Sequence, residues 1–524
     1  MSATRPLSSG VRLAELIMAL SVASDLGVGI WDGHSLRVCL LAVHLGDALG
    51  LAEEELRDTY YLALLRLAGC TADVHLAAAA LGDERYARRT MLSRLDWGNA
   101  PQMLGTIVRQ HGAGRPLVER GRMLVTLFTH LTALLDTAEA HCEVAAQLAG
   151  RLGFGANVQG WLWQIFERWD GRGYPRRLAG EAIARPVYIA QLAHDAAIFD
   201  QLGGVEAAIA VARERSGGSY DPRVAEAFVR VAPRLFAALD AAPTWDAVLA
   251  AEPGGRAGLS ETALDTAAEV IADFTDLKLP FTFGHSRGVA ALASAAARHH
   301  GLHEREVATV RRAGLLHDVG RVGVATGVWL KPGPLTEHER ERVRLHAYYT
   351  ERILARPRVL AGLGAVAALH HERLDGSGYH RGLPGILLPP AARLLAAADV
   401  YQAMTEDRPH RPAHPPEAIV AELRRQARAG LLDGEAVDAV LTAAGHRVRR
   451  KRPERPAGLS DREREVLALL TRGRSNREMA AALGISKETV NHHVRHIYNK
   501  IGVSTRAAAT LFAMQHGLVG DEAP

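Results

Sequence analysis

The chain has 524 residues, too many for one hydrophobic core and enough for about three domains of ordinary size. With 48% hydrophobic and 23% charged residues and a net charge of +4, its composition is that of a globular protein, and no apolar run approaches the ~18 residues of a membrane helix. Three cysteines without a CxxC pair exclude a disulfide framework and a thiolate zinc site. We therefore expect a cytoplasmic protein that has no export signal and no membrane partner.

The chain is rich in alanine and leucine, and only 5% of its residues are aromatic, which favours an all-α fold. Turn formers at 252–258 and a basic, proline-containing tract at 446–458 interrupt the helical patterning. These breaks predict domains at 8–251, 259–445 and 459–520, with 446–458 as a basic linker.

The first two domains are predicted to be copies of one another. Gly33-His34-Ser35 matches Gly284-His285-Ser286, an offset of 251 residues. Further along, Glu167–Pro175 matches Glu372–His380, an offset of 205 residues, so the first copy carries about 46 extra residues between the two motifs. Two matches in the same order favour duplication over chance.

Metal-ligating side chains are concentrated between residues 285 and 399 of the second copy. Five imidazoles and two carboxylates without a thiolate suit Mn, Fe or another borderline-to-hard divalent ion. A single histidine on an apolar helix is usually a packed core residue, so the prediction depends on the whole set. The expected ligands of two ions, with Asp318 as a bridge, are His285, His317, Asp318, His346, His370, His371 and Asp399.

The motifs of this segment resemble the HD-GYP family of phosphohydrolases. They are His317–Arg321, His370–Tyr379, Ala398–Tyr401 and Asp407–Pro409, in the order of the family. The resemblance implies an all-α fold, two divalent metal ions (Fe or Mn) in the helical core, and hydrolysis of cyclic di-GMP.

The resemblance also gives roles to single residues. Asp318 and Arg321 are expected to be catalytic, with Arg321 contacting phosphate where the family usually has lysine. The loop after His371 is expected to contact the substrate because its glycines permit a close backbone approach, although an ordinary tight turn explains the same glycines. The substrate-binding residues expected are Arg321, Asp375, Gly376, Gly378 and Tyr379.

Besides Arg321, four positions depart from the family pattern. His380 replaces the proline of the GYP motif, Gly288 a common arginine, and Gln402 a common aspartate. Phe281 stands where members with a third metal have glutamate, so a two-metal centre is expected. Two alternatives remain: a catalytically weak sensor that binds metal and nucleotide and controls DNA binding, or a hydrolase of another phosphate ester.

The first copy is expected to be non-catalytic. Arg66-Leu67 and Ile165-Phe166 replace the two adjacent ligand pairs, and His194 falls on Asp399. Only His34 and His141 remain of the ligand set, and two imidazoles cannot hold two ions. Burial of surface against the second copy is favoured as its role, and a ligand-binding sensory module is the alternative.

The final segment predicts a helix-turn-helix. Ser460 with Glu463 and Ser475 with Glu478 have the spacing of capping boxes, and a further helix should run from about Lys487 to Lys500 and end near Gly502. The whole segment resembles a four-helix LuxR-type DNA-binding domain, which implies DNA as a partner and binding as a homodimer. The expected DNA-binding residues are Lys487, Glu488, Thr489, Asn491, His492, Arg495 and Lys500.

Together, these features predict a one-component transcriptional regulator. Its second copy would bind and hydrolyse a cyclic dinucleotide, and the basic linker would relay the state of that copy to the DNA-binding domain.

Overall fold

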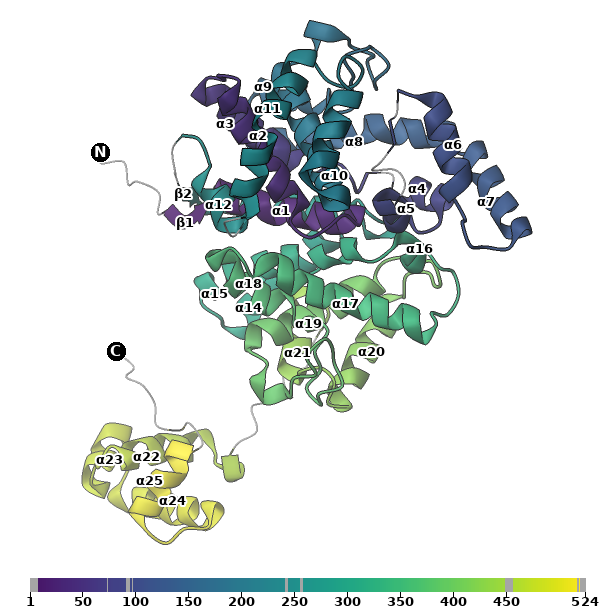
Figure 1. Ribbon diagram of the computed structural model, residues 1–524. Helices are drawn as coiled ribbons and strands as arrows, with labels where there is room; N and C mark the ends of the chain where they lie inside the picture. Colours follow the sequence, from purple (N-terminus) through teal and green to yellow (C-terminus); the bar gives the residue numbers. More distant parts are fainter. Residues whose placement is uncertain are drawn as a thin grey trace. The chain divides into compact units, whose positions relative to one another are not determined.

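The computed structural model shows an almost entirely helical protein (Figure 1), which confirms the all-α prediction. It forms two compact units, Met1–His446 and Arg447–Pro524. No helix among the described residues is both long enough and apolar enough to cross a bilayer. The described residues are 8–72, 74–90, 95–96, 98–240, 244–254, 258–447, 456–515 and 518.

Both predicted copies lie in the first unit. The first copy contains α1 (Leu13–Val28), α2 (His34–Ala48), α3 (Glu53–Leu65), α4 (Val74–Leu81), α5 (Glu84–Thr90), α6 (Ala100–Gln110), α7 (Leu117–Thr129), α8 (Leu131–Arg151), α9 (Ala156–Leu162), α10 (Arg185–Glu214), α11 (Pro222–Asp240) and α12 (Thr244–Ala250). The second contains α13 (Glu261–Asp276), α14 (His285–His300), α15 (Glu304–Leu316), α16 (Thr326–Trp329), α17 (Glu337–Leu354), α18 (Arg358–Ala367), α19 (Pro390–Met404), α20 (Pro416–Arg428) and α21 (Gly434–Ala443).

Equivalent helices of the two copies begin the same number of residues apart as the repeated sequence motifs. α2 and α14 start 251 residues apart, as do α3 and α15. Each of α2 and α14 follows a glycine with a positive φ, 75° at Gly33 and 80° at Gly284, a backbone conformation that suits glycine. In each copy a buried aspartate, Asp25 or Asp276, accepts a 2.9 Å bond from the serine amide that follows the first histidine.

A glycine is present at the same position in both copies, although the metal-ligand residues next to it are present in the second copy alone. A Cβ atom on Gly69 would lie 2.0 Å from the carbonyl oxygen of His141, and one on Gly320 would lie 2.1 Å from that of His346. These close approaches exclude any larger residue, so the repeated glycine maintains packing that both copies share.

A two-stranded antiparallel ribbon joins the beginnings of the two copies. β1 (Ser8–Arg12) precedes α1, β2 (Gly258–Ser260) precedes α13, and Ser8 lies opposite Ser260. The sequence did not predict these strands because each is too short to show an alternating pattern. The ribbon and the packing of α1 against the turn Val319–Gly323 and α17 bring the two copies into one compact unit.

The extra residues of the first copy form most of α4 to α7, which lie together at one side of it (Figure 1). Their apolar residues build a separate small cluster that includes Leu81, Leu95, Ile107 and Leu127, each less than 6% exposed. The insertion therefore has a core of its own.

The second unit contains α22 (Asp461–Thr471), α23 (Asn476–Leu483), α24 (Lys487–Ile501) and α25 (Arg506–Gln515). Both predicted capping boxes are present, at Ser460 and Ser475, and Gly502 ends α24 with a positive φ of 68°. Val490 and Ile497 of α24 are fully buried in its core.

Candidate metal centre

The seven predicted ligands converge in the helical core of the second copy. His285 is the first residue of α14, and His317 and Asp318 directly follow α15. His346 and Asp399 lie within α17 and α19, and the adjacent pair His370-His371 follows α18. Six of the seven are at most 5% exposed, and His371 is partly buried.

Asp318 lies at the middle of this group, and its two oxygens face different histidines. Oδ2 is 3.1 Å from Nε2 of His317 and 3.5 Å from Nε2 of His285. Oδ1 is 3.4 Å from Nε2 of His346 and 3.7 Å from Nε2 of His370. One carboxylate therefore serves two separate sets of imidazoles, as a ligand that bridges two ions would.

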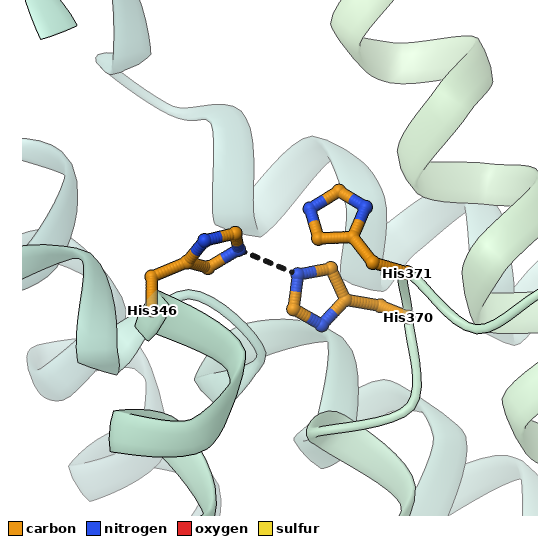
Figure 2. A group of neighbouring side chains, drawn as sticks. All are labelled: His346, His370 and His371. Carbon is orange, nitrogen blue, oxygen red and sulfur yellow. Dashed lines mark hydrogen bonds between the residues drawn. The ribbon is translucent and has the colours of Figure 1, made fainter. Parts of the chain in front are cut away.

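Each set is completed by further ligand atoms. His346, His370 and His371 offer nitrogens within 4.8 Å of one another, and Figure 2 shows the three rings side by side, with the Nε2 atoms of His346 and His370 3.1 Å apart. On the other side, His285, His317 and Asp399 offer ligand atoms equally close together. The two clusters share the Asp318 carboxylate between them.

Backbone carbonyls orient three of the imidazoles. In each case Nδ1–H donates to the carbonyl three residues earlier, so in the neutral ring Nε2 carries no proton and is directed to the centre. The bonds run from His317 to Gly314 at 2.7 Å, from His346 to Val343 at 2.6 Å, and from His370 to Ala367 at 2.7 Å.

Glu406 orients the fourth imidazole. Both of its carboxylate oxygens lie 3.0 Å from Nδ1 of His285, which leaves Nε2 directed to Asp318 and Asp399. The sequence did not predict this role, because a single glutamate in a chain with 58 acidic residues has no pattern of its own. Its position directly before the family-like Asp407-Arg408-Pro409 was the one available signal.

The buried polar atoms at the centre fit a divalent cation. Nε2 of His285, Nε2 of His317 and Oδ1 of Asp318 are buried without a hydrogen-bond partner, although they are close to one another. Such groups are costly to bury unless they coordinate or pair. Oxygen and imidazole donors in this arrangement are those that Fe and Mn bind.

The pKa values of the ligand-type residues also indicate that the buried carboxylates favour a positive charge beside them. Burial lowers the pKa of His285, but the carboxylates of Asp399 and Glu406 outweigh burial and raise it to about 9. Burial raises the pKa of Asp318, but Arg321 and His317 outweigh that effect and hold it well below its usual range. By contrast, burial and the neighbouring His317 lower the pKa of His370 to about 3, so this ring is neutral and able to act as a ligand.

Arg321 is a buried cation at the edge of the centre. One of its terminal nitrogens pairs with Oδ2 of Asp318, and its guanidinium carbon lies 5.1 Å from the ring centroid of Trp329. The remaining donors, Nε and Nη1, are buried without a hydrogen-bond partner. The side chain therefore has donors available for an anion beside Asp318.

The loop after the histidine pair is held mainly by its own residues. A Cβ atom on Gly378 would lie 2.4 Å from Cα of Glu372, so this glycine permits backbone packing within the loop. Glu372, another residue that the sequence did not single out, accepts from the amides of Arg381 and Leu383. Asp375 accepts from the amide and hydroxyl of Ser377 within the loop.

Of the predicted substrate-binding residues in this loop, Tyr379 contacts the ligand set. Its ring centroid lies 4.6 Å from that of His371. Gly376 has a φ of 79° and closes the turn. The ordinary-turn explanation thus accounts for both glycines, whereas Tyr379 is adjacent to the centre.

Two departures from the family pattern are neighbours in space. A Cβ atom on Gly288 would meet the amide group of Gln402 at 2.6 to 2.7 Å, so the missing side chain makes room for the glutamine. Gln402 in turn donates to Glu406 at 2.9 Å. The two changes therefore fit each other and preserve the support of His285.

The other two departures also have partners. The guanidinium of Arg408 stacks on Phe281, 5.1 Å from its centroid, and pairs with Glu406. An arginine thus covers the position where a third metal would require a carboxylate. His380 pairs with Glu351 at 2.8 Å, outside the ligand cluster.

The equivalent place in the first copy has no comparable ligand set. Arg66 occupies the His317 position and donates to the carbonyl of Ile165, and Nε2 of His34 lies 2.9 Å from Nδ1 of His194. His141 donates through Nε2 to the Arg66 carbonyl, so its ring is turned to the backbone. Among the described residues, no three ligand-type side chains of this copy gather as those of the second copy do.

The predicted DNA-binding side chains of α24 are all exposed: Lys487, Glu488, Thr489, Asn491, His492, Arg495 and Lys500. Lys500 also pairs with Glu463 at 2.7 Å and donates to the carbonyl of Gly458, so it has an internal role in this unit. The side-chain oxygen of Asn491 accepts a hydrogen bond from the side-chain amide of Asn476 at 2.6 Å, which connects α24 to α23.

Comparisons with known proteins define the class of protein. Residues 269–436 match the HD domain family, and residues 457–513 match the luxR family of bacterial regulatory proteins. A solved structure, that of the cyclic GMP-AMP-specific phosphodiesterase V-cGAP3 of V. cholerae, covers 83% of this chain and 98% of its own at a TM-score of 0.58 and 27% identity. This is an HD-domain protein that carries a luxR-type regulatory domain.

Curated relatives give the family. The 3'3'-cGAMP-specific phosphodiesterase 3 of Vibrio cholerae is 31% identical over 420 residues, which are 78% of this chain and 90% of the relative. The cyclic di-GMP phosphodiesterase response regulator RpfG of Xanthomonas campestris is 40% identical over 152 residues, 29% of this chain and 40% of the relative. The chain belongs to the family of HD-domain phosphodiesterases, as its motifs predicted.

Proposed function

We propose that the second copy is a two-metal phosphodiesterase that hydrolyses a 3',3'-cyclic dinucleotide, and that the same chain binds DNA as a regulator. The observation that carries the proposal is the division of the Asp318 carboxylate between two sets of imidazoles. His285, His317 and Asp399 would hold one divalent ion (Fe or Mn), and His346, His370 and His371 the other, with Asp318 bridging both.

The chain's own residues prepare the site for this chemistry. When bound, the ions supply Lewis acidity that lowers the pKa of a water molecule and offsets phosphate charge. Arg321 donates its unpartnered Nε–H and Nη1–H groups to a phosphate oxygen. Glu406 fixes the ring of His285, and Tyr379, stacked beside His371, borders the place where the substrate lies.

Cyclic di-GMP is the substrate that the HD-GYP-like motifs favour. A second candidate, 3'3'-cGAMP, is favoured by the relative that this chain matches over 90% of its length and by the structural similarity to V-cGAP3. The two nucleotides differ at one base and share the phosphodiester ring. The metal centre acts on the part they share, so the base-contacting residues decide between them.

The proposal is tested with the purified full chain loaded with Mn or Fe. Cyclic di-GMP, 3'3'-cGAMP and a phosphomonoester are supplied separately, and the linear product is measured by chromatography together with the metal content. We expect turnover of at least one cyclic dinucleotide. His317→Ala should lose both metal and turnover, whereas His299→Ala, at an exposed histidine of α14, should retain both.

Two results would change the conclusion. Metal-loaded protein that binds a cyclic dinucleotide without cleaving it, and whose DNA binding responds to it, would be a sensor. Cleavage of the phosphomonoester alone would define a hydrolase of a different ester.

We propose that α24 enters the major groove of DNA and that two chains bind a two-fold operator. The exposed Lys487 and Thr489 near its N-terminus support contacts to base edges or phosphate. Thr489→Ala should weaken binding to a selected operator by about 1–3 kcal/mol, measured by fluorescence anisotropy against a scrambled duplex. An equal loss on both duplexes would show that Thr489 does not specify sequence.

A further inference from the structure

The first copy contains a cavity of about 320 Å³ at the place where the second copy has its metal centre. Its lining includes Arg66, Ile165 and His194, which stand at the positions of His317, His370 and Asp399. Its volume is in the range of small-molecule sites. Loss of the metal ligands has therefore left a space in this copy.

The 46-residue insertion supplies one wall of this cavity, and most side chains of that wall are apolar. Leu81 of α4, Ile107 of α6 and Leu127 of α7 line it and belong to the insertion's own hydrophobic cluster. Met103 and Leu95 extend the same wall. An insertion that only buried surface against the second copy would have no reason to line a cavity with these side chains.

The lining of the cavity also carries a buried positive charge. Arg66 is 8% exposed, and its Nε has no hydrogen-bond partner. Among the described residues, no carboxylate lies within 4 Å of its guanidinium nitrogens, and the same holds for the partly buried Arg88, which also lines the cavity. A buried guanidinium that no carboxylate contacts directly is costly, which points to an anionic ligand.

The acidic groups of the lining are already engaged. Asp195 pairs with Arg215 at 2.5 Å and accepts from the hydroxyl of Tyr220. Glu167 accepts from the backbone amides of Arg176 and Leu178 at 2.6 and 2.9 Å. Burial lowers the pKa of Arg66 and the charge of Asp195 opposes that effect, but among the described residues neither carboxylate forms an ion pair with Arg66, so its Nε–H remains available to a ligand.

The two histidines that line this cavity, His141 and His194, are uncharged. Burial, followed by the charge of Arg66, lowers the pKa of His194 well below its usual range, and burial also lowers the pKa of His141 to about 4. Nε2 of His34 faces His194, and that of His141 donates to the backbone. The two lining histidines therefore add no positive charge to the cavity.

We infer that this cavity binds a small amphipathic anion, a carboxylate with a hydrocarbon body. The carboxylate accepts from Arg66, and the hydrocarbon packs against the wall formed by the insertion. A cyclic dinucleotide does not fit this lining, because it would bring two phosphates and polar bases against Leu81, Ile107 and Leu127. The first copy is thus a ligand-binding module, which was the less favoured of the two roles expected from its sequence.

The test uses the full chain and octanoate as the probe, followed by isothermal calorimetry and thermal unfolding. Octan-1-ol, with the same tail and no charge, and acetate, with the charge and no tail, are the matched compounds. We expect octanoate to bind and to raise the midpoint of unfolding, and each matched compound to bind at least tenfold more weakly. Arg66→Met should weaken octanoate binding by about 10- to 100-fold.

A second pair of variants keeps the test decisive if Arg66→Met does not fold. Ile107→Trp fills the cavity from α6 and should abolish binding. Val108→Trp, at the next residue and 41% exposed, should not change it. The inference is overturned if octanoate gives no heat, if octan-1-ol binds equally well, if neither Arg66→Met nor Ile107→Trp weakens binding, or if cyclic di-GMP binds here in an Arg66-dependent manner instead.

Discussion

At the scale of single residues, we expect Glu406 to position His285 in the proposed metal centre. Glu406→Gln removes the charge that holds Nδ1–H of His285 while keeping the size of the side chain. We expect metal affinity to fall by about 10- to 100-fold, as is usual when the partner of a ligating histidine is changed. Glu422→Gln, at an ion pair on the surface of α20, is the matched control.

The measurement for Glu406→Gln is metal binding by competition with a coloured chelator, with thermal unfolding of the metal-free protein beside it. A role confined to packing would lower the unfolding midpoint and leave the metal affinity of the folded protein unchanged. That result would contradict the assignment.

His141 sets part of the acid stability of the first copy. Burial, and then the charges of Arg88 and Arg66, lower its pKa to about 4 against a backbone hydrogen bond that raises it, whereas the unfolded chain has the ordinary value of 6.5. The unfolded state therefore binds more protons between pH 6.5 and 4. Stability from this group is fully present above pH 6.5 and is lost as the pH falls through about 4, by at most about 3 kcal/mol.

His141→Gln keeps a donor for the Arg66 carbonyl but does not titrate. We expect its free energy of unfolding to fall less steeply than that of the wild type from pH 7 to pH 4.5. Urea unfolding followed by tryptophan fluorescence reports this unit, because all seven tryptophans precede residue 447. His299→Gln, at an exposed position, should follow the wild-type curve, and a parallel curve for His141→Gln would refute the assignment.

The same scale shows what the sequence could reveal about the site. The cluster of proposed ligands could be predicted because the adjacent pairs His317-Asp318 and His370-His371 are local patterns. The partners of the ligands were not accessible, since Glu406 reaches His285 across 121 residues. Likewise Gly288 and Gln402 were noticed as separate departures, and only their contact in space shows that each accommodates the other.

At the scale of elements, local signals predicted the helices of the DNA-binding unit well. A capping box is defined by residues three apart, so both boxes could be recognised before any tertiary structure was known. The ribbon of β1 and β2 could not be, because its two strands are short and are defined by pairing between Ser8 and Ser260. Elements that depend on distant partners leave little trace in their own sequence.

Ser475 provides a test of one of these elements. Its hydroxyl accepts from the amide of Glu478 at 3.3 Å, while the Glu478 carboxylate accepts from the Ser475 amide at 2.7 Å. Ser475→Ala should cost about 1 kcal/mol in the stability of α23. Hydrogen exchange of α23 amides in the full chain measures this, with exposed Ser504→Ala as the control, and equal exchange in both variants would contradict it.

At the scale of the whole first unit, a buried ion pair joins the insertion to the catalytic copy. Glu84 of α5 is fully buried, lies 3.7 Å from Nζ of Lys278, and accepts from the amide and hydroxyl of Thr326. Lys278, 1% exposed, donates to the carbonyl of Val322, the residue after Arg321. The insertion thus contacts the turn that carries a proposed catalytic residue.

Because Lys278 is buried, its charge depends on Glu84. Burial lowers the pKa of Lys278 to about 8, and Glu84 opposes that effect. Glu84→Gln keeps an acceptor for Thr326 but leaves the ammonium without a counter-charge, so we expect a loss of about 3 kcal/mol in the free energy of unfolding. The double variant Glu84→Gln with Lys278→Met removes both charges and should recover most of that loss, because an uncharged pair has no buried charge to compensate. Urea unfolding followed by tryptophan fluorescence measures the cycle, and additive losses from the two substitutions would show that the pair does not couple the two copies.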